Sequence, residues 1–339
     1  LADPAGAAEV AGAVEALRAP VYLAGMARGL LGRGHPLQLR HRRTAALKEA
    51  DLVILAGFPI DFRLDYGRKI HRKATLVAAG RDQEALTRNR TPDLLVGGDP
   101  GLFLRRLAER VAEGAGEAGR ELPDRSGWLE TLTARDAERN AEIAETAAAE
   151  APPVNPLALL SEIERILPDD SILVADGGDF VASASYIVSP RGPLRWLDPG
   201  PFGTLGVGGG FALGAKLCRP RSEVWLLYGD GSAAYSLAEI DTFLRHGLPV
   251  IAVVGNDAGW TQIAREQVDV LGDDVAVTLR RTAYHLVAEG YGGKGFEITR
   301  PDEIRPVLEA ARRAHAEGHP VVVNAQIGTT EFRKGSISM

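Results

Sequence analysis

Cysteine is almost absent from this 339-residue sequence, which contains only Cys218. A single cysteine cannot form an internal disulfide, and it cannot build a zinc site from several thiolates. The composition therefore excludes a disulfide-stabilised scaffold. It is also the pattern expected of a protein in a reducing compartment, so we expect a cytoplasmic location.

Long apolar runs and an excess of basic residues are missing as well. The longest apolar runs, such as 251–254, have the length of a strand and are too short to cross a membrane. Residues 1–19 contain Asp3 and Glu9 and lack the basic start of a secretion signal. The 39 basic and 45 acidic residues give a net charge of -6, which argues against binding to nucleic acid. We therefore expect neither a membrane nor a nucleic acid as partner.

The apolar and charged fractions, 45% and 25%, are those of a globular protein with buried cores, and the length suggests two domains. In the first half, predicted helices alternate with short apolar strands. The helices are 7–18, 43–49 and 102–113, and the strands are 20–24, 52–55 and 76–79. This alternation predicts an α/β domain with a mostly parallel sheet. Because such domains usually open with a strand, the leading helix suggests that the sequence begins inside a domain.

A stretch of different composition separates the two halves. Residues 114–119 are small and polar, and residues 135–150 are rich in Ala, Glu and Arg, which predicts a linker and a solvated helix. The Pro-rich residues 151–156 then mark a boundary. We therefore predict a first domain at 1–140, a linker at 141–155 and a second domain at 156–339.

A second α/β pattern follows this linker. Asn155 is placed to cap a helix that has Pro156 at its first position. The predicted helices are 156–166, one starting near 206, 237–246, 282–289 and 301–315. The predicted strands are 172–175, 224–228, 250–254 and 321–327, with a long loop at 176–202. The predicted fold class is α/β, with two domains that each contain a doubly wound parallel sheet.

Two polar turns follow neighbouring strands of the second domain. Asp230 comes directly after strand 224–228, and Asn256 and Asp257 follow strand 250–254. In a right-handed βαβ unit, both turns emerge at the edge of the sheet where α/β folds bind ligands. Carboxylate, amide and carbonyl oxygens suit Mg²⁺, which usually shares a phosphate with the protein. A helix that starts near Ser232 would favour an anion there.

The alternative is that Gly229-Asp230-Gly231 forms a simple turn, which is the commoner role of such a tripeptide. The strand–helix–strand setting and the second polar turn favour the metal site. Two other phosphate-binding patterns are absent: no G-x-x-x-x-G-K-[ST] string occurs, and the run 206–210 does not continue as G-x-G-x-x-G after a strand. A magnesium-bound phosphate group is therefore the preferred interpretation.

These motifs resemble those of a known family. Gly-Asp-Gly, with Asn256-Asp257 ending 27 residues after Asp230, resembles the signature of thiamine-diphosphate enzymes, which is G-D-G followed about thirty residues later by N-N. Segments 203–208 and 212–215 resemble the G-T-M-G region of that family. Further segments are similar to its acetolactate-synthase and acyl-CoA-lyase branch, so that the resemblance covers most of the chain. They are 25–29, 35–36, 50–57 and 61–64, and then 192–200, 255–262 and 334–337.

The resemblance implies thiamine diphosphate and Mg²⁺ as cofactors. Asp230 would bind the metal through its carboxylate, and the backbone carbonyl of Gly259 would be a further ligand. In most relatives the second Asn of N-N is the other ligand, at the position of Asp257. The substitution leaves open whether Asn256 or Asp257 binds the metal, and a second carboxylate adds negative charge near a diphosphate.

The resemblance also implies cofactor-binding residues. Gly177 and Gly178, with the adjacent Asp179, would contact the diphosphate end, and the carbonyl of Gly203 would hold the aminopyrimidine. Leu205 would wedge the cofactor into its bent shape, with core packing as the alternative. The remaining implied cofactor-binding residues are Thr204, Gly229, Gly231, Ser232, Gly259 and Trp260.

Four other features have ordinary interpretations beside functional ones. Trp260 would form the floor of a substrate pocket or simply pack. His35 before a proline is more typical of a turn or cap than of a catalyst. Arg63 after Asp61 is more typical of a salt bridge than of a ligand for a CoA phosphate. The basic run 41–43 is interpreted as a solvated face.

The resemblance implies a carbon–carbon lyase or ligase that cleaves a 2-hydroxyacyl-CoA to an aldehyde and formyl-CoA. Acetolactate-type condensation of 2-oxo acids is the alternative within the family, and a non-catalytic nucleotide-binding α/β protein is the alternative of another class. In the family, the glutamate that activates the cofactor belongs to an N-terminal pyrimidine-binding domain of the neighbouring subunit. We therefore expect no catalytic residue in this chain, no turnover by it alone, and a homodimer or homotetramer.

Overall fold

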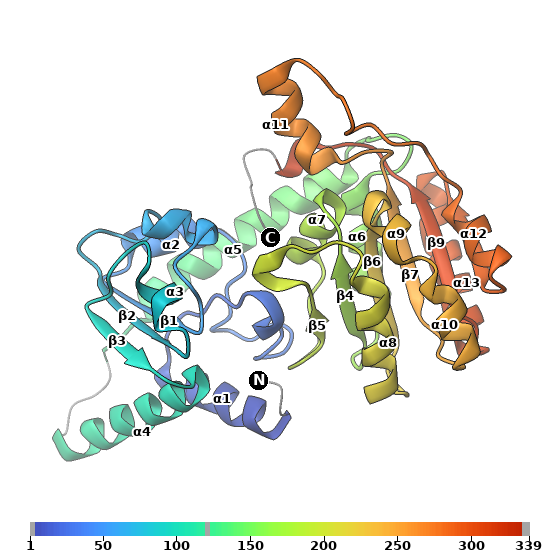
Figure 1. Cartoon of the computed structure of the whole chain (residues 1–339). Coiled ribbons are helices and arrows are strands. Elements are labelled where there is room, and N and C mark those ends of the chain that lie inside the picture. The colour runs from blue at the N-terminus through green and yellow to red at the C-terminus, as the bar shows by residue number, and fades with distance from the viewer. Residues whose placement is uncertain (1–3, 119–122, 334–339) are drawn as a thin grey trace. The chain divides into compact units, whose positions relative to one another are not determined.

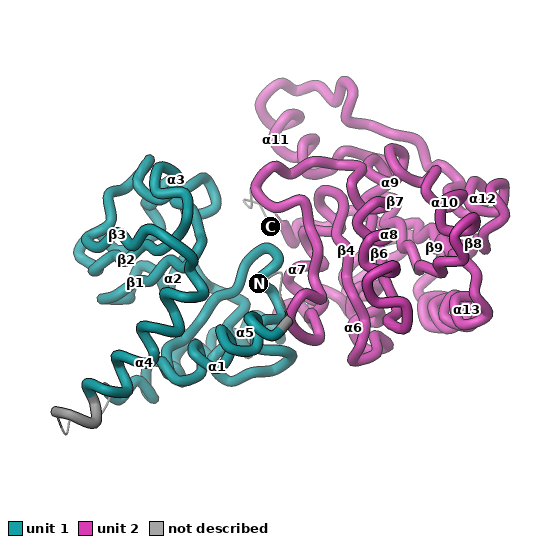
Figure 2. The backbone as a smooth tube through the Cα atoms, turned by 60° about the horizontal axis from the view of Figure 1, so that its bottom comes forward, with its two compact units in different colours: residues 1–141, 338 teal, residues 142–337, 339 magenta. Residues whose placement is uncertain are grey.

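The computed structural model describes residues 4–118 and 123–333 (Figure 1). The chain divides into two compact units, residues 1–141 and residues 142–337 (Figure 2). Each unit contains a parallel sheet of its own, so the prediction of two parallel-sheet α/β domains is confirmed. The functional limits predicted for the domains and linker stay predictions, and segment 334–337 lies outside the described residues.

The sheet of the first unit has three parallel strands in the order β1-β2-β3. Their bounds are β1 (Leu52–Ala56), β2 (Thr75–Gly80) and β3 (Leu94–Gly97). Apolar side chains of β1 and β2 form a core with Ile60, Leu64 and Ile70. The helices of this unit are α1 (Pro4–Leu17), α2 (Arg43–Glu49), α3 (Gln83–Thr87) and α4 (Pro100–Ala118), with the 3₁₀ turns η1 (Gly25–Ala27) and η2 (Phe62–Gly67).

Two sequence predictions differ from the structure in this part of the chain. The predicted strand 20–24 is a single parallel bridge between Val21 and Gln38, because η1 turns the chain immediately afterwards. The predicted solvated helix 135–150 is present as the second part of α5 (Ser126–Ala148), which starts earlier, and Ile143 is the one buried residue within the predicted range. Strand β3 was not predicted, since it has only four residues and is largely exposed.

The basic run 41–43 is a solvated face only in part, because Arg42 is exposed whereas His41 is buried and Arg43 is half-buried. The backbone N–H of His41 donates to Asp136 at 2.8 Å, and its Nε2 lies 3.0 Å from Asn140 Oδ1. Arg43 donates to the carbonyl of Arg63 at 3.2 Å. His41 and Arg43 thus depart from the prediction because oxygens from other segments lie within hydrogen-bond distance of them.

The second unit contains six parallel strands in the order β5-β4-β6-β7-β9-β8. Their bounds are β4 (Ile172–Asp176), β5 (Trp196–Leu197), β6 (Val224–Gly229), β7 (Ile251–Asn256), β8 (Lys294–Ile298) and β9 (Val321–Gln326). The four central strands are buried almost throughout, which is why they appear in the sequence as continuous apolar runs.

Helices cover both faces of this sheet (Figure 1). One core packs α6 (Pro156–Ile166), α7 (Asp179–Ile187) and α13 (Ile304–Ala316) on the sheet, and the other packs α8 (Gly208–Cys218), α10 (Glu239–Arg245) and α12 (Tyr284–Gly290). The remaining elements are α9 (Asp230–Ser236), α11 (Thr261–Leu271), η3 (Gly200–Phe202), η4 (Pro301–Glu303) and η5 (Glu331–Arg333). Within the described ranges, no helix is both long and apolar enough to span a membrane.

The predicted cap at Asn155 is confirmed: its Oδ1 accepts the backbone N–H of Leu157 at 2.8 Å. The predicted loop 176–202 is wrong, because it contains α7 and β5. Its Gly177-Gly178 start and small Ala and Ser residues resemble a loop in sequence. The predicted helix 237–246 is present as α10, and the helix expected to start near Ser232 is α9, which begins at Asp230.

Candidate cofactor site at the carboxyl edge of the second sheet

The carboxyl ends of β4, β6 and β7 lie side by side, because these strands are hydrogen-bonded neighbours in register. The turns that follow them therefore meet at one edge of the sheet. Gly177 lies against Gly229 so closely that a Cβ on Gly177 would stand 2.5 Å from Gly229 N. Gly177 also has a φ of 150°, so only glycine suits this position.

Asp230 begins α9 and is 2% exposed. Its Oδ1 accepts the N–H of Gly231 at 2.8 Å, and its Oδ2 accepts the N–H of Gly259 at 3.1 Å. Burial, reinforced by the negative charge of Asp257, raises its pKa to about 7. The predicted convergence of Asp230 with the β7 turn is therefore present, as a pair of carboxylates that repel each other when both are ionised.

The β7 turn separates the roles of Asn256 and Asp257. Asn256 is fully buried, and its Nδ2 donates to the carbonyl of Thr282 at 3.0 Å and to Asn324 Oδ1 at 3.2 Å. Asp257 accepts the hydroxyl of Thr261 at 2.5 Å, and burial together with the charge of Asp179 raises its pKa. Asn256 is thus tied to the neighbouring strand β9, whereas Asp257 is the residue whose charge acts on Asp230.

The backbone between Asp257 and Gly259 is strained. Ala258 adopts the left-handed conformation, with a φ of 60°, which costs an alanine roughly 1 kcal/mol. This conformation turns the N–H of Gly259 toward Asp230. Strain of this kind persists where the surrounding structure needs it, and it marks functional turns more often than ordinary loops.

Asp176, at the end of β4, was missed by the sequence predictions. Its carboxylate is fully buried and accepts the N–H groups of Gly206 at 3.1 Å and Gly208 at 2.7 Å. Its carbonyl accepts the hydroxyl of Ser232 at 2.6 Å. Asp176 therefore fixes the Gly-rich segment before α8 and the first turn of α9 to one strand end. An aspartate directly after an apolar strand is the same signal that singled out Asp230.

Trp260 covers the first turn of α9. A Cβ on Gly231 would lie 2.5 Å from the indole ring, so the ring lies directly on this glycine. Beside it is a pocket of about 550 Å³, whose lining includes Tyr235, Trp260, Arg280 and Tyr284. Trp260 thus both packs and lines a pocket, and the two roles predicted for it are compatible.

The segment 203–205 is the least enclosed part of the predicted site. Gly203 and Thr204 are exposed, and Leu205 is half-buried. Leu205 is not among the residues of the buried core, and its role as a wedge for the cofactor stays a prediction. The segment is linked to the sheet edge through the hydrogen bond from Gly206 to Asp176.

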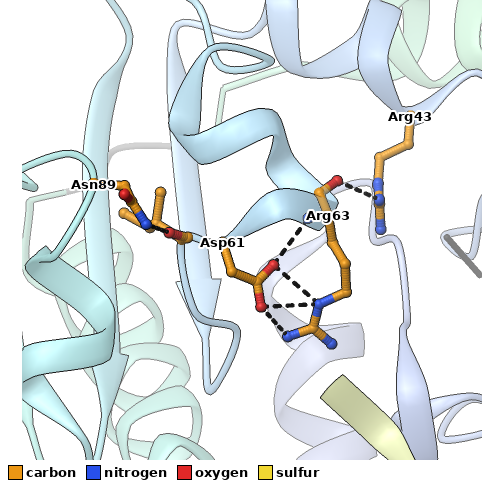
Figure 3. Close-up of polar contacts among 5 residues, drawn as sticks. Arg43, Asp61, Arg63 and Asn89 are labelled. Atoms are coloured by element: carbon orange, nitrogen blue, oxygen red, sulfur yellow. Dashed lines mark hydrogen bonds and ion pairs between the residues drawn. The ribbon is translucent and has the colours of Figure 1, made fainter. Parts of the chain in front are cut away.

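The two weaker candidates of the first unit have structural partners. His35 Nδ1 accepts the N–H of Leu37 at 3.2 Å, and His35 Nε2 lies 3.2 Å from Glu15, which is a turn-stabilising role. Arg63 donates to both carboxylate oxygens of Asp61 (Figure 3). Its guanidinium lies 4.6 Å from the centre of the Phe58 ring. Arg63 is therefore a salt-bridge residue.

The donor set of the edge fits a magnesium diphosphate. Among the described residues there is no group of three or more His, Cys, Asp or Glu side chains able to hold a metal. The edge supplies two carboxylates, Asp230 and Asp257, and a carbonyl at Gly259. Such an incomplete oxygen set suits Mg²⁺, which takes the remaining ligands from phosphate and water.

Comparison with known proteins agrees with this geometry. Residues 176–325 match the model of the thiamine pyrophosphate enzyme C-terminal TPP binding domain, and residues 2–107 match the central domain of the same enzymes. The chain belongs to the thiamine pyrophosphate enzyme family, and the resemblance stated from its motifs is confirmed. Thiamine diphosphate is accordingly the cofactor of its C-terminal domain.

Comparison with individual relatives indicates which members of the family this chain is similar to. The chain is 51% identical over 346 residues to 2-hydroxyacyl-CoA lyase 2 of Homo sapiens and 50% identical over 345 residues to that of Danio rerio. These alignments cover 100% and 99% of this chain and 54% of each relative. A "Probable acetolactate synthase" of Mycobacterium bovis is 38% identical over 313 residues, with 92% of this chain and 55% of the relative covered. The chain thus spans about half the length of the curated relatives it matches.

Proposed function

We propose that the protein is part of a thiamine-diphosphate- and Mg²⁺-dependent carbon–carbon lyase that cleaves a 2-hydroxyacyl-CoA to an aldehyde and formyl-CoA. The observation that carries this proposal is the carboxylate pair of Asp230 and Asp257 at the β6/β7 edge. The groups that donate hydrogen bonds to these carboxylates are backbone N–H groups and a hydroxyl, which do not neutralise their negative charges. Support for the substrate class comes from the relatives named 2-hydroxyacyl-CoA lyase 2, at 50% and 51% identity.

In this proposal, Asp230, Asp257 and the carbonyl of Gly259 hold Mg²⁺. Asp257 is preferred to Asn256 as the ligand, because Mg²⁺ favours carboxylate oxygens and the charge of Asp257 acts on Asp230. The Nδ2 of Asn256 donates to Thr282 and Asn324, while its buried Oδ1 has no hydrogen-bond partner among the described residues. When bound, thiamine diphosphate supplies a carbon nucleophile, and the protein supplies its position and electrostatic environment.

The rest of the cofactor is assigned to the neighbouring turns. Gly177, Gly178, Gly229, Gly231 and Ser232 surround the diphosphate. Gly203, Thr204 and Leu205 hold the aminopyrimidine end, and Trp260 closes one side. The fixed positions of these turns keep the diphosphate oriented without rearrangement on binding.

We further propose that the complete enzyme is a homodimer or homotetramer in which a pyrimidine-binding domain supplies the activating glutamate. Residues 1–339 alone then bind the cofactor without turning over substrate. Product formation by the purified chain would refute that statement. The cytoplasmic location expected from the single cysteine stays a prediction.

The binding proposal is tested by calorimetric titration of residues 1–339 with thiamine diphosphate, with and without Mg²⁺. We expect binding that requires Mg²⁺ and that weakens by about 100-fold or more in D230N, because a metal ligand is lost. D61N is the matched control, since Asp61 is paired with Arg63 in the other unit. Equal binding with and without Mg²⁺ would rule out the proposed site.

Acetolactate-type condensation is the second candidate, favoured by the 38% identical acetolactate synthase. The two activities differ in their products, so the complete enzyme should be supplied with each substrate in turn. Formyl-CoA supports the lyase, and acetolactate supports the synthase. A chain that binds no thiamine diphosphate would instead favour the non-catalytic nucleotide-binding alternative.

A further inference from the structure

Three carboxylates lie along the carboxyl edge of the second sheet, just after three neighbouring strands. They are Asp179 after β4, Asp230 after β6 and Asp257 after β7. The charge of Asp179 acts on Asp257, and that of Asp257 acts on Asp230. A diphosphate bound among them would add further negative charge, so the site needs more positive charge than one Mg²⁺ supplies.

Helix α11 brings one cation to this cluster. Arg265 Nη2 lies 2.6 Å from Asp179 Oδ2, and the two side chains are 18% and 13% exposed. Among the described residues, Asp179 is the one of the three carboxylates with a basic side chain within ion-pair distance, and that side chain is Arg265. Thr261, which donates to Asp257, lies one turn earlier on the same face of α11. One helix face thus serves both Asp257 and Asp179.

Some polar atoms of the Arg265–Asp179 ion pair have no hydrogen-bond partner among the described residues. Arg265 Nη2 is buried and has no hydrogen-bond acceptor among the described residues, and Asp179 Oδ1 is buried and has no donor there. The two groups are close, but their geometry is not that of the usual forked arginine–carboxylate pair. Buried polar atoms without partners are rare in folded proteins, and a water molecule, an ion or a bound group can satisfy them.

We propose that Arg265 is the charge-balancing residue of the diphosphate site. Its positive charge is needed because Asp257 adds a negative charge to that site. Arginine is well suited to this role, because it stays charged when buried and its N–H groups match phosphate oxygens. Asp179 holds the guanidinium in place through their ion pair. The inference rests on the proposed function, and it adds a residue that the family motifs did not indicate.

The test is calorimetric titration of residues 1–339 with two probes, thiamine diphosphate and inorganic pyrophosphate, each in the presence of Mg²⁺. R265Q should weaken both by about 10-fold, because a charge-assisted contact is lost. R265K, which keeps the charge, should lose no more than about 3-fold. R221Q is the control. It removes the same charge from an exposed arginine just before the amino end of β6, away from the carboxyl ends of the strands, and should bind like wild type.

The decisive variant is the double substitution D257N/R265Q. In the D257N background the excess charge is gone, so R265Q should cost no more than about 3-fold relative to D257N alone. A merely structural role for Arg265 would give the same loss in both backgrounds. Melting temperatures of all variants show whether each is folded.

The outcomes separate the two proposals. Wild-type-like binding by R265Q, or equal losses in the wild-type and D257N backgrounds, overturns the inference and leaves the proposed function standing. Failure of the wild-type chain to bind either probe overturns the proposed function, and the inference with it. A loss confined to the wild-type background supports both.

Discussion

The two units each contain an aspartate-bearing turn after a parallel strand, and the two turns differ in how their charge is balanced. Asp61 in the first unit accepts the backbone N–H of Arg63 at 3.0 Å and receives its guanidinium at 2.7 Å (Figure 3). Asp230 in the second unit accepts backbone N–H groups, and its charged neighbour is Asp257. The first carboxylate is neutralised by an arginine, whereas the second faces another carboxylate.

This difference distinguishes a structural carboxylate from one arranged for a ligand. A buried or half-buried carboxylate that has its own arginine is already stable without any addition. A buried carboxylate pair with no cation is stable only when protonated or when a metal binds. The turn that contains Asp230 is therefore expected to attract a cation. This agrees with the match of the second unit to the TPP binding domain.

The largest effect is expected from G177A, which tests how closely the turns of the second unit must approach. The added Cβ would stand 2.5 Å from Gly229 N at a position with a φ of 150°. We expect a loss of about 3 kcal/mol in the free energy of unfolding. Chemical denaturation measures it. G210A is the control, because Gly210 lies on α8 with open space around it, and this change should be neutral or slightly stabilising.

R63Q tests the neutralised side of the comparison. The substitution removes the guanidinium from Asp61 and from the face of Phe58, and it should cost about 1 to 2 kcal/mol of stability. Denaturant titration measures the loss, and Mg²⁺-dependent binding of thiamine diphosphate should be unchanged. Weakened binding would show that Arg63 belongs to a ligand site after all.

D257N tests the carboxylate pair that has no neutralising arginine among the described residues. In contrast to R63Q, this substitution should increase the stability of the metal-free protein. Above about pH 7 Asp230 is ionised in the metal-free protein, and removing the neighbouring charge of Asp257 should stabilise it by roughly 1 kcal/mol. Below that pH the effect should shrink, because Asp230 is protonated. Thermal unfolding in the presence of a chelator, between about pH 5 and pH 8, measures the difference between variant and wild type.

The same pKa fixes the direction of the pH dependence in the wild type. Folded Asp230 keeps its proton to about pH 7, whereas an unfolded aspartate loses it near its ordinary pKa of 3.8. The folded state therefore holds more protons between these values, and the contribution of Asp230 to stability falls as the pH rises through them. A D257N variant that is less stable than wild type above about pH 7 would contradict this account.

Much of the second sheet could be predicted from the sequence, because its central strands are continuous apolar runs. Strands β6 and β7 end where Asp230 and Asn256 begin the polar turns. The position of the ligand-binding edge and the polar residues on it could therefore be predicted from the sequence. Helix α11 was not predicted, although Ile263, Val268 and Leu271 repeat at roughly helical spacing, and in the structure none of its residues is buried. The pairing of Arg265 with Asp179 joins α11 to α7, and only the folded chain brings these two residues together.

The division of roles between Asn256 and Asp257 also depends on tertiary structure. The sequence leaves either residue as the metal ligand. The hydrogen bonds from Asn256 to Thr282 and Asn324 arise from the packing of β7 beside β9. They fix the orientation of the Asn256 amide and leave its Oδ1 without a hydrogen-bond partner among the described residues, an arrangement that the sequence alone does not reveal.

The most direct test of the central claim is a crystal structure of residues 1–339 with Mg²⁺ and thiamine diphosphate. The account predicts one metal ion, bound by the carboxylates of Asp230 and Asp257, by the carbonyl of Gly259 and by diphosphate oxygens. A metal bound through Asn256 instead of Asp257, or a diphosphate located away from the β6/β7 edge, would contradict it.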